Sequence, residues 1–280
     1  MKDPKLLSVQ DISCVGQCSL TVALPIISAC GVETAVLPSA VLSTHTGWKN
    51  GYTFRDLTDD IEGIVAHWER EKIDFDAIYT GYLGSLRQIA LVRDLFRRVA
   101  APGCVKIVDP AMGDDGKLYP GFDRNFAHEM GKLCGDADVA LPNITEACMM
   151  TDEPFMASGY DEAYIRRLMD NVLALGAKIV VLTGVSYEEG RIGVAVLAKG
   201  DEKISYYFHE RLPRNCHGTG DVFASAFAGA MMRGRAPIEA ARIAADFTVA
   251  SMKATADDES HWYGVKFEKA IPSLIAALNK

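Results

Sequence analysis

The sequence lacks any block of lysine or arginine residues, and its charge balance is acidic. The 29 Lys and Arg residues are outnumbered by 37 Asp and Glu residues, so the formal net charge of the 280-residue chain is −8 at pH 7. Proteins that bind nucleic acids or anionic membranes normally present a basic surface, so the composition predicts no nucleic-acid and no membrane partner. A small anionic ligand is compatible with it, because backbone N–H groups can bind an anion without net positive charge.

Long hydrophobic runs are also missing. A membrane-spanning helix needs about 18 or more apolar residues in a row, and the nearest candidate, residues 19–30, is interrupted by Pro25. The segment 6–11 contains Ser8, Gln10 and Asp11 and is therefore unlike the apolar core of a signal peptide. We expect a soluble, cytoplasmic protein.

Cysteines spaced for zinc or redox chemistry are absent as well. The seven cysteines are an odd number and include no C-x-x-C pair. We interpret most of them as small buried hydrophobic residues in a reducing compartment. Hydrophobic residues make up 49% of the chain, which is enough to fill a core and excludes an intrinsically disordered protein.

Short runs of strand-forming residues alternate with longer helical patterns along the whole chain. The pattern predicts strands at 6–9, 33–37, 75–79, 104–108, 139–141 and 179–182, a hairpin at 192–197 and 204–209, and helices at 19–29, 54–72, 86–99, 160–175, 221–233, 237–254 and 265–278. Without repeats or a Pro/Ser-rich linker, this predicts one domain over residues 1–280. Its expected fold is α/β, with a mostly parallel sheet between two layers of helices. Ligands of such sheets bind beyond the carboxyl ends of the strands.

The motif with the strongest chemical content is Gly218-Thr219-Gly220-Asp221, directly before an Ala-rich run. The two glycines allow a sharp turn close to a ligand, and the run behind them predicts a helix whose first N–H groups lack partners. This arrangement forms an anion hole suited to a phosphoryl group in transfer, and Asp221 could accept the proton of an attacking hydroxyl group. The alternative is structural: Thr219 or Asp221 caps the helix, and the glycines form a turn.

Two further polar sites follow predicted strands. Asp109 comes directly after the apolar run that ends at Val108, where a metal ion or phosphate group would bind. Asn143 and Glu146 follow the strand 139–141 and share one helical face, so they could hold a hydrated Mg²⁺ ion. The same pair fits an N-cap with Glu at the third helical position equally well. Three such sites at strand ends are much less expected by chance than one.

The chain resembles the ribokinase-like superfamily and, within it, the vitamin B6 kinases, over essentially its whole length. The resemblance rests on Ser8-Val9-Gln10-Asp11, Ser43-Thr44-His45-Thr46-Gly47, Gly81-Tyr82-Leu83-Gly84-Ser85, Asp109-Pro110-Ala111-Met112-Gly113, Asn143 with Glu146, and Gly218-Thr219-Gly220-Asp221. The last motif is specific to the superfamily, whereas the Tyr-Leu-Gly-Ser and Asp-Pro-x-Met-Gly elements favour the vitamin kinases. The chain has no Walker motif, which excludes a P-loop kinase.

This resemblance implies phosphorylation by ATP of the 5′-hydroxymethyl group of pyridoxal, pyridoxamine or pyridoxine, with Mg²⁺ as cofactor. It implies that Asp221 is the general base and that Gly218, Thr219 and Gly220 form the anion hole. On the ATP side it places Asp109, Asn143, Glu146 and Thr183, with Asp109 and Glu146 toward Mg²⁺. Around the vitamin it places Asp11, Thr46, Gly47, Tyr82 and Cys216. The family also suggests a homodimer.

Many B6 kinases carry Ser where this chain has Asp11. A carboxylate at this position favours a protonated pyridine nitrogen or a different ring. The related hydroxymethylpyrimidine kinases also carry an Asp near this strand end, but they commonly have Cys in place of Asp221. Three alternatives stay open: a hydroxymethylpyrimidine kinase of thiamine synthesis, a sugar kinase of the same superfamily, and a nucleotide-binding protein of the same fold without catalysis.

Three weaker features remain. Cys216 could add to the aldehyde of pyridoxal as a hemithioacetal, or it is an inert loop thiol. Residues 113–122 form a polar loop, which is either a lid over the site or an ordinary solvated connection. Four ring residues near the motifs are interpreted as structural, two as hydrogen-bonded histidines and two as packing residues: His45, His217, Trp48 and Trp262.

Overall fold

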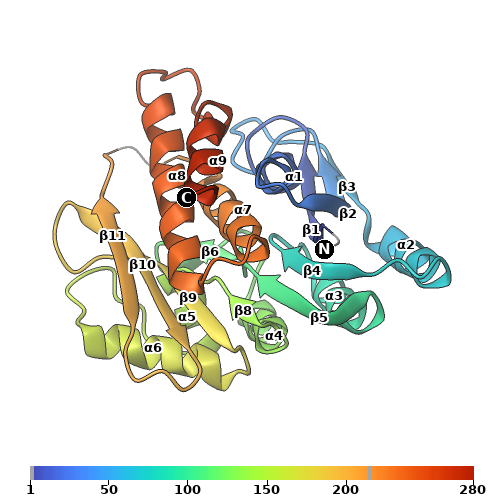
Figure 1. The fold of residues 1–280 in the computed structure, drawn as a ribbon, viewed down its shortest axis with the longest axis horizontal. Helices are drawn as coiled ribbons and strands as arrows, with labels where there is room; N and C mark the ends of the chain where they lie inside the picture. Colours follow the sequence, from blue (N-terminus) through green and yellow to red (C-terminus); the bar gives the residue numbers. More distant parts are fainter. Residues whose placement is uncertain (1–2, 214–215) are drawn as a thin grey trace.

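The computed structural model describes residues 3–213 and 216–280, and nine strands in these ranges form one twisted sheet (Figure 1). The strands are β1 (Lys5–Ser13), β2 (Glu33–Leu42), β3 (Phe54–Asp56), β4 (Phe75–Thr80), β5 (Ala100–Val108), β8 (Val139–Ala140), β9 (Ile179–Val185), β10 (Arg191–Ala198) and β11 (Ser205–Glu210). Their order across the sheet is β11-β10-β9-β8-β5-β4-β1-β2-β3. A separate small hairpin consists of β6 (Gly113–Asp114) and β7 (Lys117–Leu118).

The centre of the sheet is parallel and its two ends are antiparallel. All neighbouring pairs from β2 through β1, β4, β5 and β8 to β9 are parallel. β3 pairs antiparallel with β2, and β10 pairs antiparallel with both β9 and β11. The predicted mostly parallel sheet and the hairpin near residue 200 are therefore confirmed.

The described helices cover both faces of the sheet (Figure 1). One layer contains α1 (Leu20–Ala29), α7 (Thr219–Met232), α8 (Pro237–Thr255), the short 3₁₀ helix η1 (Phe267–Lys269) and α9 (Ile271–Leu278). The other contains α2 (Thr58–Arg70), α3 (Leu86–Arg98), α4 (Arg124–Gly135), α5 (Ile144–Thr151) and α6 (Glu162–Ala174). The predicted three-layer architecture is confirmed.

Alternate residues of the central strands supply the two hydrophobic cores. In β9, Val180 and Leu182 belong to the core under α2–α6, whereas Val181 belongs to the core under α1 and α7–α9. In β5, Val108 and Ile107 divide in the same way. Because both faces of these strands are buried, their sequences are apolar runs rather than alternating patterns.

Several predicted boundaries were wrong. β1 and β2 extend well past the predicted ends at residues 9 and 37, and β2 continues through Pro38, which has β1 as its only paired neighbour because β3 begins to pair at Ala40. Residues 54–56, predicted as the first turn of a helix, form β3. The predicted helix 265–278 is interrupted at Ala270, between η1 and α9. α4 was not predicted at all.

Within the described residues, no helix combines the length and the apolar character needed to cross a membrane.

Candidate active site

Five of the predicted site residues lie at one edge of the sheet. Asp11 is near the end of β1, Tyr82 follows β4, Asp109 follows β5, Asn143 follows β8, and Thr183 is near the end of β9. These strands are parallel neighbours, so their carboxyl ends share this edge. It is the edge where α/β proteins of this type bind ligands.

The predicted anion hole lies at the start of α7. Gly218 has a φ of 74°, and a Cβ atom at this position would lie 1.8 Å from the carbonyl oxygen of Gln17. A side chain is therefore excluded at Gly218 by both the backbone conformation and the available space. The N–H group of Val222 makes the first bond within the helix, to the carbonyl oxygen of Gly218 at 3.0 Å. The N–H groups before it have no partner inside the helix and are suited to an anion.

Asp221 lies in the first turn of α7, where it is partly buried. Burial raises the pKa of its carboxyl group to about 7, the backbone N–H of Ser19 opposes this rise, and the nearby Asp11 adds to it. A carboxylate with a pKa near neutrality is well matched to general-base catalysis at physiological pH. The N-cap residue of α7 is Gly218, so Asp221 is not the cap of this helix.

Asp11 is almost completely buried, with 4% of its surface exposed. Its carboxylate accepts hydrogen bonds from the hydroxyl groups of Ser19 (2.6 Å) and Ser13 (3.0 Å). Burial raises the pKa of Asp11, and these hydroxyl groups oppose the rise. The pKa of Tyr82 is raised to about 12, by burial and then by the negative charge of Asp11. The structure therefore brings together Asp11 and Tyr82, which come from separate strand ends.

Asp109 and Glu146 form a buried acidic pair. Burial and the proximity of Glu146 raise the pKa of Asp109, and burial raises the pKa of Glu146 to about 7. One oxygen of Glu146 accepts the N–H of Met112 (3.1 Å) and the other accepts the N–H of Asn143 (2.8 Å). The side chain of Asn143 in turn accepts the N–H of Glu146, which completes a capping box. Asn143 and Glu146 therefore form the helix N-cap that was the structural alternative for this pair, and this cap places Glu146 beside Asp109.

The remaining predicted nucleotide contact, Thr183, lies beside Asn143. Its N–H donates to the carbonyl oxygen of Pro142 at 3.0 Å, and residues 143 and 183 form an isolated parallel bridge. In the described part of the chain, no cluster of three or more His, Cys, Asp or Glu side chains is arranged to hold a metal ion. A Mg²⁺ ion at Asp109 and Glu146 would therefore need further ligands, such as phosphate oxygens and water.

Ring contacts join the loop after β2 to His217, before α7, and to Trp262, in the loop between α8 and η1. The ring of His45 lies 4.9 Å from that of His217, and the ring of Trp48 lies 4.6 Å from that of Trp262. Gly47 donates its N–H to Nδ1 of His45 at 3.0 Å, as expected for a structural histidine. Contacts between these rings bring the exposed loop residues Thr46 and Gly47 next to the anion hole.

Two more of the predicted features lie near this edge. Residues 113–122, predicted as a loop, contain the hairpin β6–β7, whose turn is held by a bond from Gly116 N–H to the hydroxyl of Thr145 (2.9 Å). Phe122, at the end of this segment, stacks on Phe126 with ring centroids 3.8 Å apart. Cys216 stands just before the anion hole, and its carbonyl oxygen accepts the hydroxyl of Thr219 at 3.3 Å.

Sequence reasoning missed Gln88, a buried residue of α3 that anchors the loop carrying Tyr82. Its Oε1 accepts the N–H of Gly84 (2.7 Å), and its Nε2 donates to the hydroxyl of Thr58 (2.9 Å) and the carbonyl oxygen of Ser39 (3.1 Å). Polar residues at helix starts are common, so the sequence offered no signal for this role. The other missed residues are Ser13 and Ser19, which hold Asp11.

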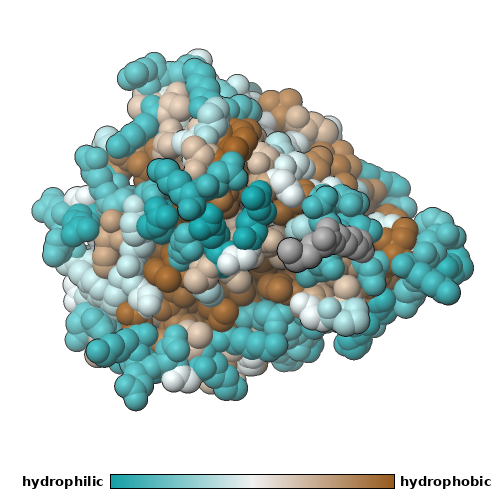
Figure 2. Space-filling view, viewed as in Figure 1, coloured by the Kyte–Doolittle hydropathy of each residue, from teal (hydrophilic) through white to brown (hydrophobic). Residues whose placement is uncertain are grey.

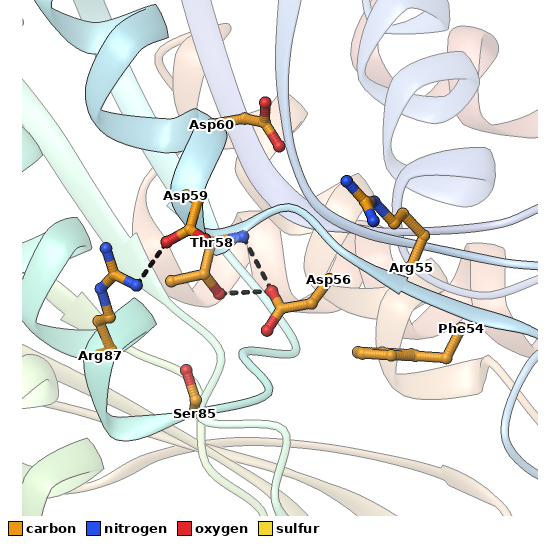
Figure 3. A pocket seen from close by; sticks show the side chains of 8 residues that line it. All are labelled: Phe54, Arg55, Asp56, Thr58, Asp59, Asp60, Ser85 and Arg87. Atoms are coloured by element: carbon orange, nitrogen blue, oxygen red, sulfur yellow. Dashed lines mark hydrogen bonds and ion pairs between the residues drawn. The ribbon is translucent and has the colours of Figure 1, made fainter.

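An open cleft of about 450 Å³ lies at the junction of β3, α2 and α3 (Figure 3). Its charged side chains include Asp59 and Arg87, whose exposed ion pair is drawn in Figure 3. The cleft shares only Ser85 with the sequence motifs and contains none of the predicted site residues. The candidate active site is therefore the carboxyl edge of the sheet and not this cleft.

Comparison with known proteins agrees with this fold. The model of the phosphomethylpyrimidine kinase family matches residues 27–264. A pyridoxine/pyridoxal/pyridoxamine kinase of Bordetella bronchiseptica is 27% identical over 261 residues, which cover 89% of each chain. A Bacteroides thetaiotaomicron protein assigned to the phosphomethylpyrimidine kinases, crystallised with pyridoxal, is 36% identical, with a TM-score of 0.92 and coverage of 98% of this chain and 96% of its own.

The pyridoxal kinase of Lactobacillus plantarum is 30% identical, with a TM-score of 0.89, and the match covers 98% of this chain and 97% of that one. The predicted ribokinase-like architecture is confirmed by this structural agreement. The match of the family model over most of the chain gives the same result from sequence. The chain therefore belongs to the phosphomethylpyrimidine kinase family and is a kinase with the ribokinase-like fold.

Proposed function

We propose that this kinase transfers the γ-phosphoryl group of ATP to the 5′-hydroxymethyl group of pyridoxal, pyridoxamine or pyridoxine. The observation that carries the proposal is the position of Asp221, in the first turn of α7 and near enough to the buried carboxylates Asp11 and Asp109 to interact with both electrostatically. The similarity to a protein crystallised with pyridoxal and to kinases named for all three vitamers supports this substrate class. We further propose that residues 1–280 act as one kinase domain.

In the proposed reaction, Asp221 takes the proton of the substrate hydroxyl group. The oxygen attacks the γ-phosphorus, the bond from that phosphorus to the β–γ bridging oxygen breaks, and ADP leaves. The backbone N–H groups at Gly218, Thr219 and Gly220 stabilise the negative charge on the transferring group. This charge stabilisation and the alignment of the two substrates are the main requirements of phosphoryl transfer.

On the vitamin side, we propose that Asp11 binds a protonated pyridine nitrogen and that Tyr82 covers the ring. Thr46 and Gly47 would approach from the loop after β2. Cys216 would lie near the aldehyde of pyridoxal, where its thiol could add to the carbonyl carbon and pass its proton to the carbonyl oxygen. The burial of Asp11 and the closeness of Tyr82 support this division of roles.

On the nucleotide side, we propose that Asp109, Asn143, Glu146 and Thr183 surround the phosphates of ATP. Mg²⁺, when bound with ATP, supplies positive charge to the phosphate oxygens. Asp109 and Glu146 support the fit of a cation here, because both are buried carboxyl groups with raised pKa values. A positive charge beside them would favour their ionised form. Glu146 already accepts backbone N–H groups with both oxygens, so we assign the closer contact to Asp109.

A homodimer is also proposed. Figure 2 shows apolar side chains gathered over the region of α1, β2 and β3. Large apolar side chains that are exposed in these elements and the loop between them include Leu24, Tyr52 and Phe54. A contiguous exposed apolar surface commonly marks a contact between proteins.

The test of the proposed function is a substrate panel with Mg·ATP. Pyridoxal, pyridoxamine, pyridoxine and hydroxymethylpyrimidine are compared by release of ADP, with a reaction without acceptor as the control. We expect pyridoxal or pyridoxamine to give the highest kcat/KM. A clear preference for hydroxymethylpyrimidine would assign the enzyme to thiamine synthesis instead, and ADP release that no acceptor stimulates would contradict a kinase acting on either ring.

A further inference from the structure

Ser19, which lies beside the carboxylates of Asp11 and Asp221, has an unusual backbone conformation. Its φ is 56° and its ψ is −134°, a combination that lies outside the regions accessible to residues with a side chain at little cost. Asp152, another described residue with positive φ, has ψ 21° and falls in the ordinary left-handed region, so it is less strained. The conformation of Ser19 therefore persists only because its surroundings impose it.

Ser19 also gives up the role that its position in the sequence suggests. It is the N-cap residue of α1, where a serine hydroxyl normally accepts an N–H group of the first turn, yet it makes no such bond. Its hydroxyl group instead donates to Oδ1 of Asp11 at 2.6 Å, the shorter of the two hydroxyl contacts of that carboxylate. The folded protein is therefore destabilised at Ser19 in two ways, by the strained backbone and by the missing cap of α1.

Both polar groups of Ser19 act on carboxylates of the site. Its backbone N–H group forms a hydrogen bond with the carboxyl group of Asp221 and lowers the pKa of that group, and its hydroxyl group donates to Asp11. The residue is held between β1 and α1, because it bridges to Ile12 and its carbonyl oxygen accepts the N–H of Ala23 at 2.8 Å. One residue, 5% exposed, therefore contacts both the proposed vitamin-binding carboxylate and the proposed base.

We infer that Ser19 is a positioning residue, which holds Asp11 through its hydroxyl group and Asp221 through its strained backbone, so that the bound vitamin and the base stay aligned. The inference rests on the proposed function. It assigns different effects to the two parts of the residue. Loss of the hydroxyl group should weaken binding of the vitamin, and release of the backbone should slow the phosphoryl transfer itself.

Two variants separate these parts. Ser19→Ala removes the hydroxyl group and retains the Cβ atom, which keeps the backbone strain, whereas Ser19→Gly removes both. We expect KM for pyridoxal to rise about tenfold in both variants, as for loss of a hydrogen bond to a charged group, with KM for ATP within twofold of wild type. In Ser19→Gly we also expect kcat to fall several-fold below that of Ser19→Ala, although Ser19→Gly should have the higher melting temperature.

Lys72 provides the matched control. It also has a positive φ of 55°, but it is exposed at the end of α2. Lys72→Gly should melt above Lys72→Ala, with the kinetic constants of both equal to those of wild type. This control separates relief of backbone strain in general from its effect at the site.

The outcomes distinguish the inference from the proposed function. A wild-type protein that does not phosphorylate pyridoxal would overturn the proposed function, whereas the melting temperatures still report on the strain at Ser19. Unchanged KM values for pyridoxal in both Ser19 variants would overturn the role of the hydroxyl group. A Ser19→Gly variant that is at least as active as Ser19→Ala, or that melts no higher, would overturn the role of the strained backbone.

Discussion

The pKa of Asp221 connects the catalytic proposal with measurable pH dependence. With a pKa of about 7, this carboxyl group is largely protonated under mildly acidic conditions and cannot act as a base there. We therefore expect kcat to rise with pH through about 7 and to level off above it.

Asp221→Asn should lower kcat by about 10²- to 10⁴-fold and leave the affinity for Mg·ATP nearly unchanged, because the backbone N–H groups of Gly218 to Gly220 remain.

The same variant has a signature in stability. The pKa of Asp221 is about 7 in the folded protein against an ordinary value of 3.8, so the folded state binds a proton that the unfolded state releases between these values. Asp221 therefore contributes stability that is present at acid pH and is lost as pH rises through about 7. As pH rises toward and through about 7, wild type should lose this stability and Asp221→Asn should not. The melting temperature of Asp221→Asn relative to that of wild type should therefore be higher at pH 8 than at pH 5. In the activity measurement, a kcat of Asp221→Asn within a few-fold of that of wild type would show that Asp221 is only structural.

At the scale of single elements, the start of α7 allows a comparison of two glycines in one motif. Gly218 has positive φ and no room for a side chain, whereas a Cβ atom on Gly220 would meet nothing within 4 Å. We expect Gly218→Ala to lower the free energy of unfolding by more than about 1 kcal/mol and to lose activity. Gly220→Ala should stay within about 1 kcal/mol of wild type. Urea denaturation checks both values, and a Gly218→Ala variant as stable as wild type would contradict the structure at this turn.

Helix α3 contributes to the site through Gln88. Gln88→Ala leaves the N–H of Gly84 and the carbonyl oxygen of Ser39 without their side-chain partner, so we expect a loss of about 2–3 kcal/mol in stability. Because the loop with Tyr82 loses its anchor, KM for pyridoxal should rise more than KM for ATP. Arg87→Ala is the neighbouring control, because it removes only an ion pair with Asp59 whose side chains are 65% and 87% exposed, and it should change stability by about 0.5 kcal/mol or less. Equal effects of the two variants would refute the anchoring role.

At the scale of the whole molecule, the proposed homodimer depends on the apolar surface over α1, β2 and β3. Sedimentation should give a mass of twice the 30.4 kDa of one chain. Phe54 is 51% exposed, and Phe54→Asp should shift the mass toward that of one chain, because it places a charge on this surface. Leu175→Asp, at the end of α6 in the other helix layer, is the control and should leave the mass unchanged. A monomeric wild-type protein would contradict the proposal.

The alternation of elements and the positions of the motifs were predictable from the sequence because both depend on local patterns. Apolar runs such as 104–108 indicate buried strands, and Asn143 with Glu146 indicates a helix start whichever neighbours surround it. Parallel pairing then follows from the long helical crossovers between strands. With the motifs at strand ends, this was enough to expect the candidate residues of the central strands at one edge of the sheet.

Only the tertiary structure decided which of these residues meet. Residues 54–56 became a strand because β2 offers its free edge, which no local pattern reveals. Ser19 looks like an ordinary N-cap in the sequence, and its bond to Asp11 depends on how the loop between β1 and α1 closes against α7. Gly218 is required because the backbone of Gln17 packs against it. Such contacts join segments that are distant in the chain, so their geometry depends on packing, and the sequence by itself determined the residue types present but not their alignment.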